Sequence, residues 1–126
     1  MKRLFSIRGA VCSENTKEDI IKNVGNLASE LFRKNSIQAQ DLVNIQFTMT
    51  PDLNEMNAAA ALRKSDTGVD VSGTALFTSQ EAVIKGMPQK VIRMMVTVYL
   101  EESAVPCHVY QNGAEKLRPD LCGAGR

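Results

Sequence analysis

Val91-Ile92-Arg93-Met94-Met95-Val96-Thr97-Val98 is the stretch that decides the fold. It is short, largely apolar and rich in β-branched residues, which predicts a central strand of a sheet, covered on both faces. Arg93 is the exception, because a guanidinium keeps its charge and is costly to bury without a partner. Arg93 is therefore either paired with an internal carboxylate or lines a cavity that receives an anion.

The remaining elements follow from periodicity on either side of this strand. Asn15, with Glu18 three residues later, has the form of a helix cap, and an amphipathic pattern of about 20 residues behind it predicts one long helix. The alanine run within 55–65 predicts a second helix, with Arg63 on its last turn. Alternation and breaker residues predict four more strands, at 4–12, 43–50, 74–78 and 106–111. Pro119 excludes a helix through 115–121.

This order of elements predicts an α+β (α/β) domain with a mixed β-sheet and one long helix packed on it. We expect a single domain over residues 1–121, followed by a frayed C-terminal tail at 122–126. One long helix covers only one face of such a sheet. A second copy of the chain is the simplest cover for the other face, so the sequence favours a homo-oligomer.

Composition narrows the class of protein. The chain has 126 residues with 15 Lys+Arg against 14 Asp+Glu, which argues against a general nucleic-acid binder. No apolar run reaches the roughly 20 residues that span a membrane, and the basic start ends too soon at Ser6 for a signal peptide. Three cysteines without C-x-x-C spacing indicate reduced thiols in a cytoplasmic protein and no zinc site.

The polar residues in strand and helix contexts favour one kind of ligand. Several guanidiniums with one carboxylate and one phenol suit a small dianion that carries hydroxyl groups, because arginine holds carboxylates bidentately. We find no nucleophile beside a base, no metal-ligand cluster and no phosphate loop, so neither cofactor nor metal is expected. The candidate ligand-binding residues are Arg8, Arg63, Glu81, Arg93, Tyr110 and Arg118. These residue types alone do not specify a reaction.

Six motifs, found in a fixed order, resemble a known family. They are Ile7-Arg8-Gly9-Ala10, Thr50-Pro51-Asp52-Leu53, Gln80-Glu81, the central strand, His108-Val109-Tyr110 and Leu117-Arg118-Pro119-Asp120-Leu121. Together they resemble the monofunctional α/β class of chorismate mutase, over nearly the whole chain. The resemblance implies a pseudo-barrel homotrimer with active sites at subunit interfaces. It also implies an isomerase that converts chorismate to prephenate in the shikimate route to phenylalanine and tyrosine.

The resemblance assigns roles by position. Arg93 would donate to the ether oxygen of the breaking C–O bond, and Glu81 would orient Arg93 and accept from the ring hydroxyl. The other implied substrate-binding residues are Arg8 and Tyr110 at the side-chain carboxylate, Arg63, Arg118 and Leu117 towards the ring carboxylate and closing tail, and Asn57, Phe77 and Thr78. A pericyclic rearrangement needs no proton transfer and no covalent intermediate, so a site with fixed charge and no nucleophile is consistent with it.

The chain departs from the family pattern at a few positions. Asn57 stands where an aromatic residue is frequent, Ala60 where a lysine is frequent and Thr78 where a cysteine is frequent, and the loop at 66–73 is longer. Two alternatives are therefore kept, both by fold analogy. One is a non-catalytic trimer that binds a small carboxylate metabolite. The other is a trimer like the small imine deaminases, which also use an arginine for a carboxylate.

Overall fold

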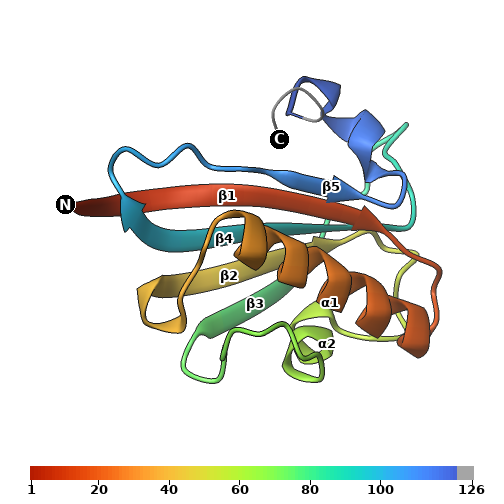
Figure 1. The fold of residues 1–126 in the computed structure, drawn as a ribbon. Helices are drawn as coiled ribbons and strands as arrows, with labels where there is room; N and C mark the ends of the chain where they lie inside the picture. The colour runs from red at the N-terminus through yellow and green to blue at the C-terminus, as the bar shows by residue number, and fades with distance from the viewer. Residues whose placement is uncertain (122–126) are drawn as a thin grey trace.

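The computed structural model describes residues 1–121, which form one five-stranded mixed sheet (Figure 1). The strand order is β3-β2-β4-β1-β5, so the stretch 91–98 lies in the central strand, as predicted. β4 pairs antiparallel with β1 and β2, while β3 and β5 add parallel edges. The strands are β1 (Lys2–Cys12), β2 (Leu42–Met49), β3 (Ala75–Gln80), β4 (Val91–Glu101) and β5 (Val109–Gln111). The predicted tail at 122–126 lies outside the described residues.

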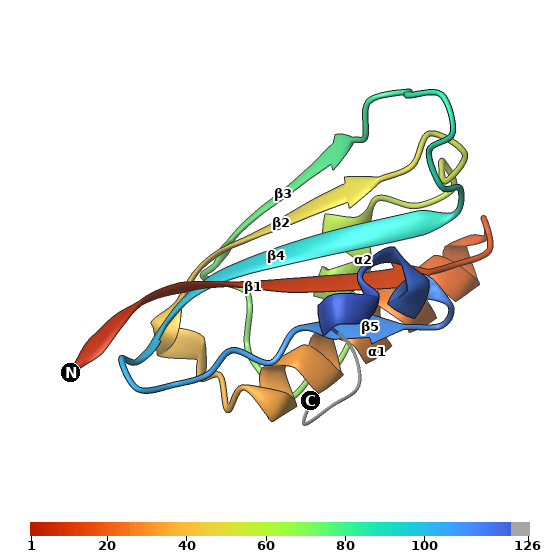
Figure 2. The same cartoon turned by 90° about the horizontal axis from the view of Figure 1, so that it is seen from above.

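Both helices pack on the same face of the sheet (Figures 1 and 2). α1 (Lys17–Lys34) crosses the strands diagonally, and α2 (Ala58–Arg63) lies beside it over β2 and β3. Gly9 on β1 lets α1 come close, since a Cβ there would lie 3.2 Å from Leu31 Cδ1 and 3.3 Å from Leu27 Cδ1. The buried stripe of α1 meets the inward side chains of the strands in one core. That stripe is Ile20, Val24, Leu27, Ala28, Leu31 and Phe32.

The predicted start of α1 is wrong by one residue. Thr16 is the N-cap, and its hydroxyl accepts from the backbone N–H of Asp19. Asn15, the residue expected to cap, instead uses its side-chain oxygen to accept from the backbone N–H groups of Asn54 and Glu55, at 3.0 and 3.1 Å. Asn15 therefore ties the start of α1 to the loop before α2.

Element ends differ elsewhere by a few residues. α2 begins only at Ala58, because Asn57 caps it, and β5 begins at Val109. Three short 3-10 turns complete the described chain, at Ala39–Asp41, Ala114–Leu117 and Pro119–Leu121. The last two are separated at Arg118, so the prediction of no helix through Pro119 is confirmed. Neither described helix has the length and apolar character needed to cross a bilayer.

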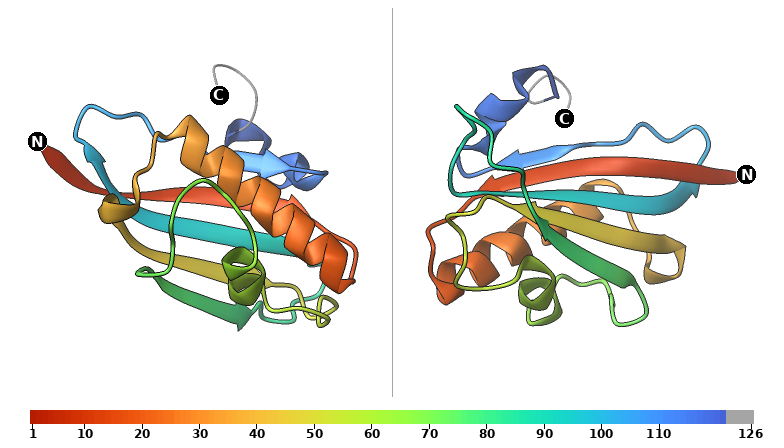
Figure 3. Two further views of the ribbon diagram at one scale, coloured as in Figure 1. Left: turned by 60° about the horizontal axis from the view of Figure 1, so that its bottom comes forward. Right: turned by 180° about the vertical axis from the view of Figure 1, so that it is seen from behind.

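The second face of the sheet is open in the single chain (Figure 3, right). Residues of β4 alternate between the two faces, so Val96 and Val98 are buried whereas Met95 is 38% exposed and Tyr99 is 45% exposed. Both helices lie on one side, so the chain by itself covers only one face of the sheet, as expected from its single long helix. Cover of the other face by a second copy stays a prediction.

Candidate active site

A pocket of about 350 Å³ lies on the open face of the sheet. Strand register brings its charged residues together: Ala10 of β1 pairs with Arg93 of β4 and with Tyr110 of β5, and Arg8 pairs with Met95. Since alternate residues of a strand share a face, the side chains of Arg8, Arg93 and Tyr110 point to the same side. Arg118, from the C-terminal turns, also lines the pocket. The structure thus gathers three of the four predicted arginines and the predicted tyrosine.

Arg93 is both paired and facing the pocket. Its Nε donates to Glu81 Oε2 at 2.8 Å, and the hydroxyl of Thr48 donates to the same oxygen at 2.7 Å. Glu81 comes directly after β3, where its backbone N–H donates to the carbonyl of Met49 on β2 at 2.9 Å. Within residues 1–121 the terminal nitrogens of Arg93 have no hydrogen-bond partner. The carboxylate therefore fixes the guanidinium and leaves its outer edge available.

The tail contributes a second paired guanidinium. Arg118 donates to Asp120 through Nε at 3.0 Å and through Nη2 at 2.7 Å. This bidentate hydrogen bond raises the pKa of Arg118 and lowers the pKa of Asp120. Leu117 lies one residue before, at the end of a 3-10 turn, and is half-buried.

A hydrogen bond also joins the two strands that carry Arg8 and Tyr110. The backbone N–H of Arg8 donates to His108 Nδ1 at 2.9 Å, which ties β1 to the residue just before β5.

Three predicted residues lie on the opposite side of the sheet, with the helices. Asn57 caps α2 by accepting from Ala59 and Ala60 N–H groups at 2.8 and 3.3 Å, and Thr78 donates to the same amide oxygen at 2.9 Å. Arg63 lines another hollow, formed with the loop at 65–74. Phe77 pairs with Gln46, which lines the main pocket, and is 64% exposed at the sheet edge. A single chain therefore does not bring Asn57, Thr78 and Arg63 to the pocket of Arg93.

A family model described as chorismate mutase type I matches residues 4–121 of this chain, which carry the pocket and the fold. The chain belongs to the chorismate mutase type I family. It is 33% identical over 120 residues to "Chorismate mutase AroH" of Bacillus subtilis (strain 168), covering 91% of this chain and 90% of that protein. The solved structure titled "Chorismate mutase from Clostridium thermocellum Cth-682" superimposes with a TM-score of 0.78 at 33% identity, covering 89% of this chain and 98% of that one.

Family membership confirms the predicted fold and class of activity. The five-stranded mixed sheet with helices packed on it is the fold shared with the solved chorismate mutase. The activity is that of a chorismate mutase, an isomerase of aromatic amino acid biosynthesis. The imine-deaminase alternative receives no support from these matches.

Sequence reasoning missed several residues that line the open-face pocket. Thr48, Gln46 and Ser79 lie there alongside the arginines. A signal was available, since Asn44, Gln46 and Thr48 are the polar members of an alternating strand. The pattern gives the face of each residue, but the pairing of Thr48 with Arg93 depends on register between strands far apart in the sequence.

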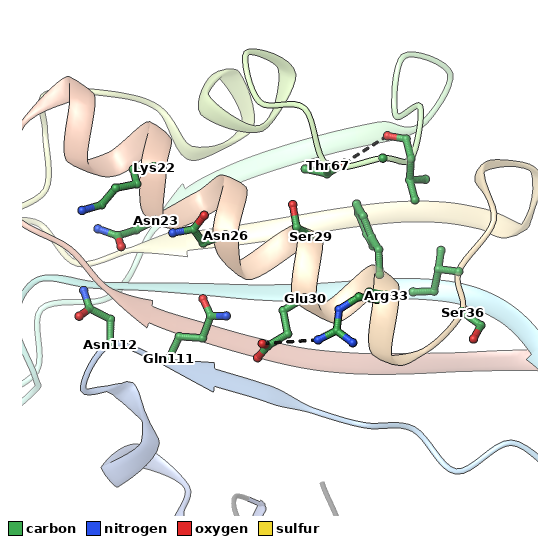
Figure 4. A pocket seen from close by; sticks show the side chains of 14 residues that line it. Lys22, Asn23, Asn26, Ser29, Glu30, Arg33, Ser36, Thr67, Gln111 and Asn112 are labelled. Atoms are coloured by element: carbon green, nitrogen blue, oxygen red, sulfur yellow. Dashed lines mark hydrogen bonds and ion pairs between the residues drawn. The ribbon is translucent and has the colours of Figure 1, made fainter.

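A larger hollow of about 920 Å³ runs along the outer side of α1 (Figure 4). Its lining is mostly neutral and polar, with an ion pair of 3.9 Å between Glu30 and Arg33. None of the predicted site residues lines it. The open-face pocket is therefore the candidate active site.

Among residues 1–121, histidine, cysteine and acidic side chains form no group of three that could hold a metal ion.

Proposed function

We propose that the open-face pocket binds chorismate and accelerates its rearrangement to prephenate through fixed positive charge, without a covalent intermediate or cofactor. The observation that supports this most is the geometry of Arg93, which lines the pocket with its Nε held by Glu81 and with its terminal nitrogens unpaired within residues 1–121. In the rearrangement a C–O bond breaks as a C–C bond forms, and negative charge grows on the ether oxygen. A guanidinium already in place stabilises that charge without reorganisation.

The neighbouring groups would hold the substrate in a compact conformer. Arg8 and Tyr110 take the side-chain carboxylate in this proposal, since both line the pocket from adjoining strands. Glu81 has one oxygen engaged by Arg93 and Thr48, and its other oxygen would accept from the ring hydroxyl. Arg118 would reach the substrate from the tail. Holding both ends of a flexible substrate near the reacting geometry is a large part of the rate gain.

The proposal includes a homotrimer whose sites lie between subunits. Asn57, Thr78 and Arg63 sit on the helix side of the sheet, so they can meet the pocket only of a neighbouring copy. The uncovered apolar residues Met95 and Tyr99 supply a surface for such a contact. We also take residues 1–121 as one domain and place the protein in the cytoplasm, in keeping with the free thiols of Cys12 and Cys107.

The test is an assay of chorismate absorbance with the purified chain and an Arg93→Gln variant. This substitution keeps a hydrogen-bond donor but removes the fixed charge, which matters far more in the transition state than in the ground state. The kcat should fall by roughly 10²–10³ or more, while KM changes much less. Arg33→Gln, at an exposed position on α1, is the control and should behave as wild type.

Two outcomes would contradict the proposal. A wild-type chain that binds chorismate without consuming it would favour the non-catalytic binder. A folded Arg93→Gln variant that keeps more than about a tenth of wild-type kcat would show that the charge of Arg93 is not needed for catalysis. Circular dichroism and light scattering establish that each variant is folded and assembled like the wild type.

A further inference from the structure

Thr48 occupies a central position beneath the proposed site. It lies on β2 between two pocket-lining neighbours, opposite Arg93 of β4 and opposite Ser79 of β3. Its side chain is half-buried and faces the pocket. Residues directly opposite on adjoining strands have their Cβ atoms close together, so Thr48 and Arg93 stand side by side.

The hydroxyl of Thr48 engages the oxygen that also holds Arg93. Thr48 Oγ1 lies 2.7 Å from Glu81 Oε2, and Arg93 Nε lies 2.8 Å from the same atom. A carboxylate paired with a guanidinium only accepts hydrogen bonds, so the hydroxyl is the donor here. Both donors converge on Oε2. The second carboxylate oxygen and the outer edge of Arg93 therefore stay available to substrate.

We infer that Thr48 is a positioning residue, which fixes the Glu81 carboxylate and, through it, the guanidinium of Arg93. The terminal torsion of a glutamate is broad, so an ion pair through one oxygen does not by itself define the carboxylate plane. A threonine has few side-chain rotamers and sits on a strand bonded on both sides. Its hydroxyl supplies the second point that holds the plane. This inference rests on the proposed function of Arg93 and Glu81.

The test compares Thr48→Val with Thr48→Ser. Valine keeps the shape and β-branching but has no donor, so the carboxylate and Arg93 can shift from the reacting geometry. We expect kcat to fall roughly ten- to a hundredfold with KM within about threefold. Serine restores the donor and should return kcat to within about fivefold of wild type. Thr97→Val is the matched control, because Thr97 faces the same side of the sheet on β4 without contacting Glu81, and it should keep wild-type kinetics.

A double-mutant cycle tests independently whether Thr48 acts through Glu81. In a Glu81→Ala background Thr48 has no carboxylate to hold, so adding Thr48→Val should change kcat by less than about threefold. Thermal unfolding of every variant separates a loss of stability from a loss of rate.

Several results would overturn the inference. They are a Thr48→Val variant with wild-type kcat, a Thr48→Ser variant as slow as valine, or equal effects of Thr48→Val with and without Glu81. If Thr48→Val matches wild type while Arg93→Gln is inactive, only the role of Thr48 fails. If Arg93→Gln is active, the proposed function of the charge fails whatever Thr48 does.

Discussion

Arg93 can perform two tasks because a guanidinium has two usable edges. The Nε edge binds Glu81, and the terminal nitrogens of this pocket-lining residue have no hydrogen-bond partner within residues 1–121. A lysine has one compact ammonium and could not satisfy the half-buried Glu81 carboxylate and a substrate oxygen with the same fixed geometry. The pairing with Glu81 therefore fixes the orientation of the guanidinium, and a fixed donor is what stabilises negative charge as it develops.

The charged groups of the site should make turnover insensitive to pH near neutrality. Asp120 has a lowered pKa, so its pairing is present above its ordinary pKa and is lost only as pH falls through the lowered value. Arg118 has a raised pKa, so its ion pair with Asp120 is lost only as pH rises through that raised value, far above neutral. We expect kcat to be constant within about twofold from pH 7 to pH 9, as a rearrangement without proton transfer predicts.

Chelators should also leave the rate unchanged, which a stopped assay with and without EDTA checks. Dialysed enzyme that regains activity only with an added divalent ion, or a sharp bell centred near neutral pH, would point to a different chemistry.

Among the elements, the C-terminal turns are the part of the site with the least support from the sheet. Arg118 lies between two 3-10 turns, and its bidentate partner, Asp120, belongs to the same short segment. Ala114 is the buried anchor of this segment. We expect the turns to close as a unit over bound substrate, with their internal ion pair intact.

Truncation after Glu115 tests this role of the turns. It keeps the Ala114 anchor and removes Leu117 and Arg118, so substrate binding should suffer more than the chemical step. We expect KM to rise about tenfold or more, with kcat within about fivefold of wild type. Arg118→Ala, in the full chain, separates loss of the charge from loss of the segment. Identical kinetics for full-length and truncated chains would show that the turns take no part.

The elements also show where sequence patterns reach their limit. Alternation predicted strands such as β2, and helical periodicity predicted α1, because burial on one face imposes those periods. The central strand followed from its β-branched apolar run, and α2 followed from the helix propensity of its alanines. Asn15 and Thr16 each precede an acid by three residues, and the choice between them depends on Asn15 reaching Asn54, a tertiary contact. The motif resemblance predicted Arg93 and Glu81, whose pairing the structure shows, whereas Thr48 required the β2–β4 register.

For the whole molecule, the open face of the sheet predicts assembly. We expect light scattering to give the mass of a trimer at micromolar concentration. Met95→Glu places a charge in the middle of the uncovered face, where burial against another copy would be costly, and should shift the chain towards monomer. Val105→Glu is the control, because Val105 is exposed in the loop between β4 and β5 rather than on a strand of the sheet, and it should remain a trimer. A stable and fully active monomer would exclude sites shared between subunits.

The central place of β4 has a consequence for biosynthesis of the chain. β4 separates β2 from β1 in the sheet, and its pairing with β1 joins Lys2 to Glu101. During translation the N-terminal strand and β2 are made long before the strand that bonds both of them, so each presents an unpaired edge to its surroundings. Closing such distant pairs is slow, and collapsed chains with free edges aggregate readily. The domain therefore completes its fold only after β4 has been made, and brief shielding of the emerging chain by a chaperone should raise its yield.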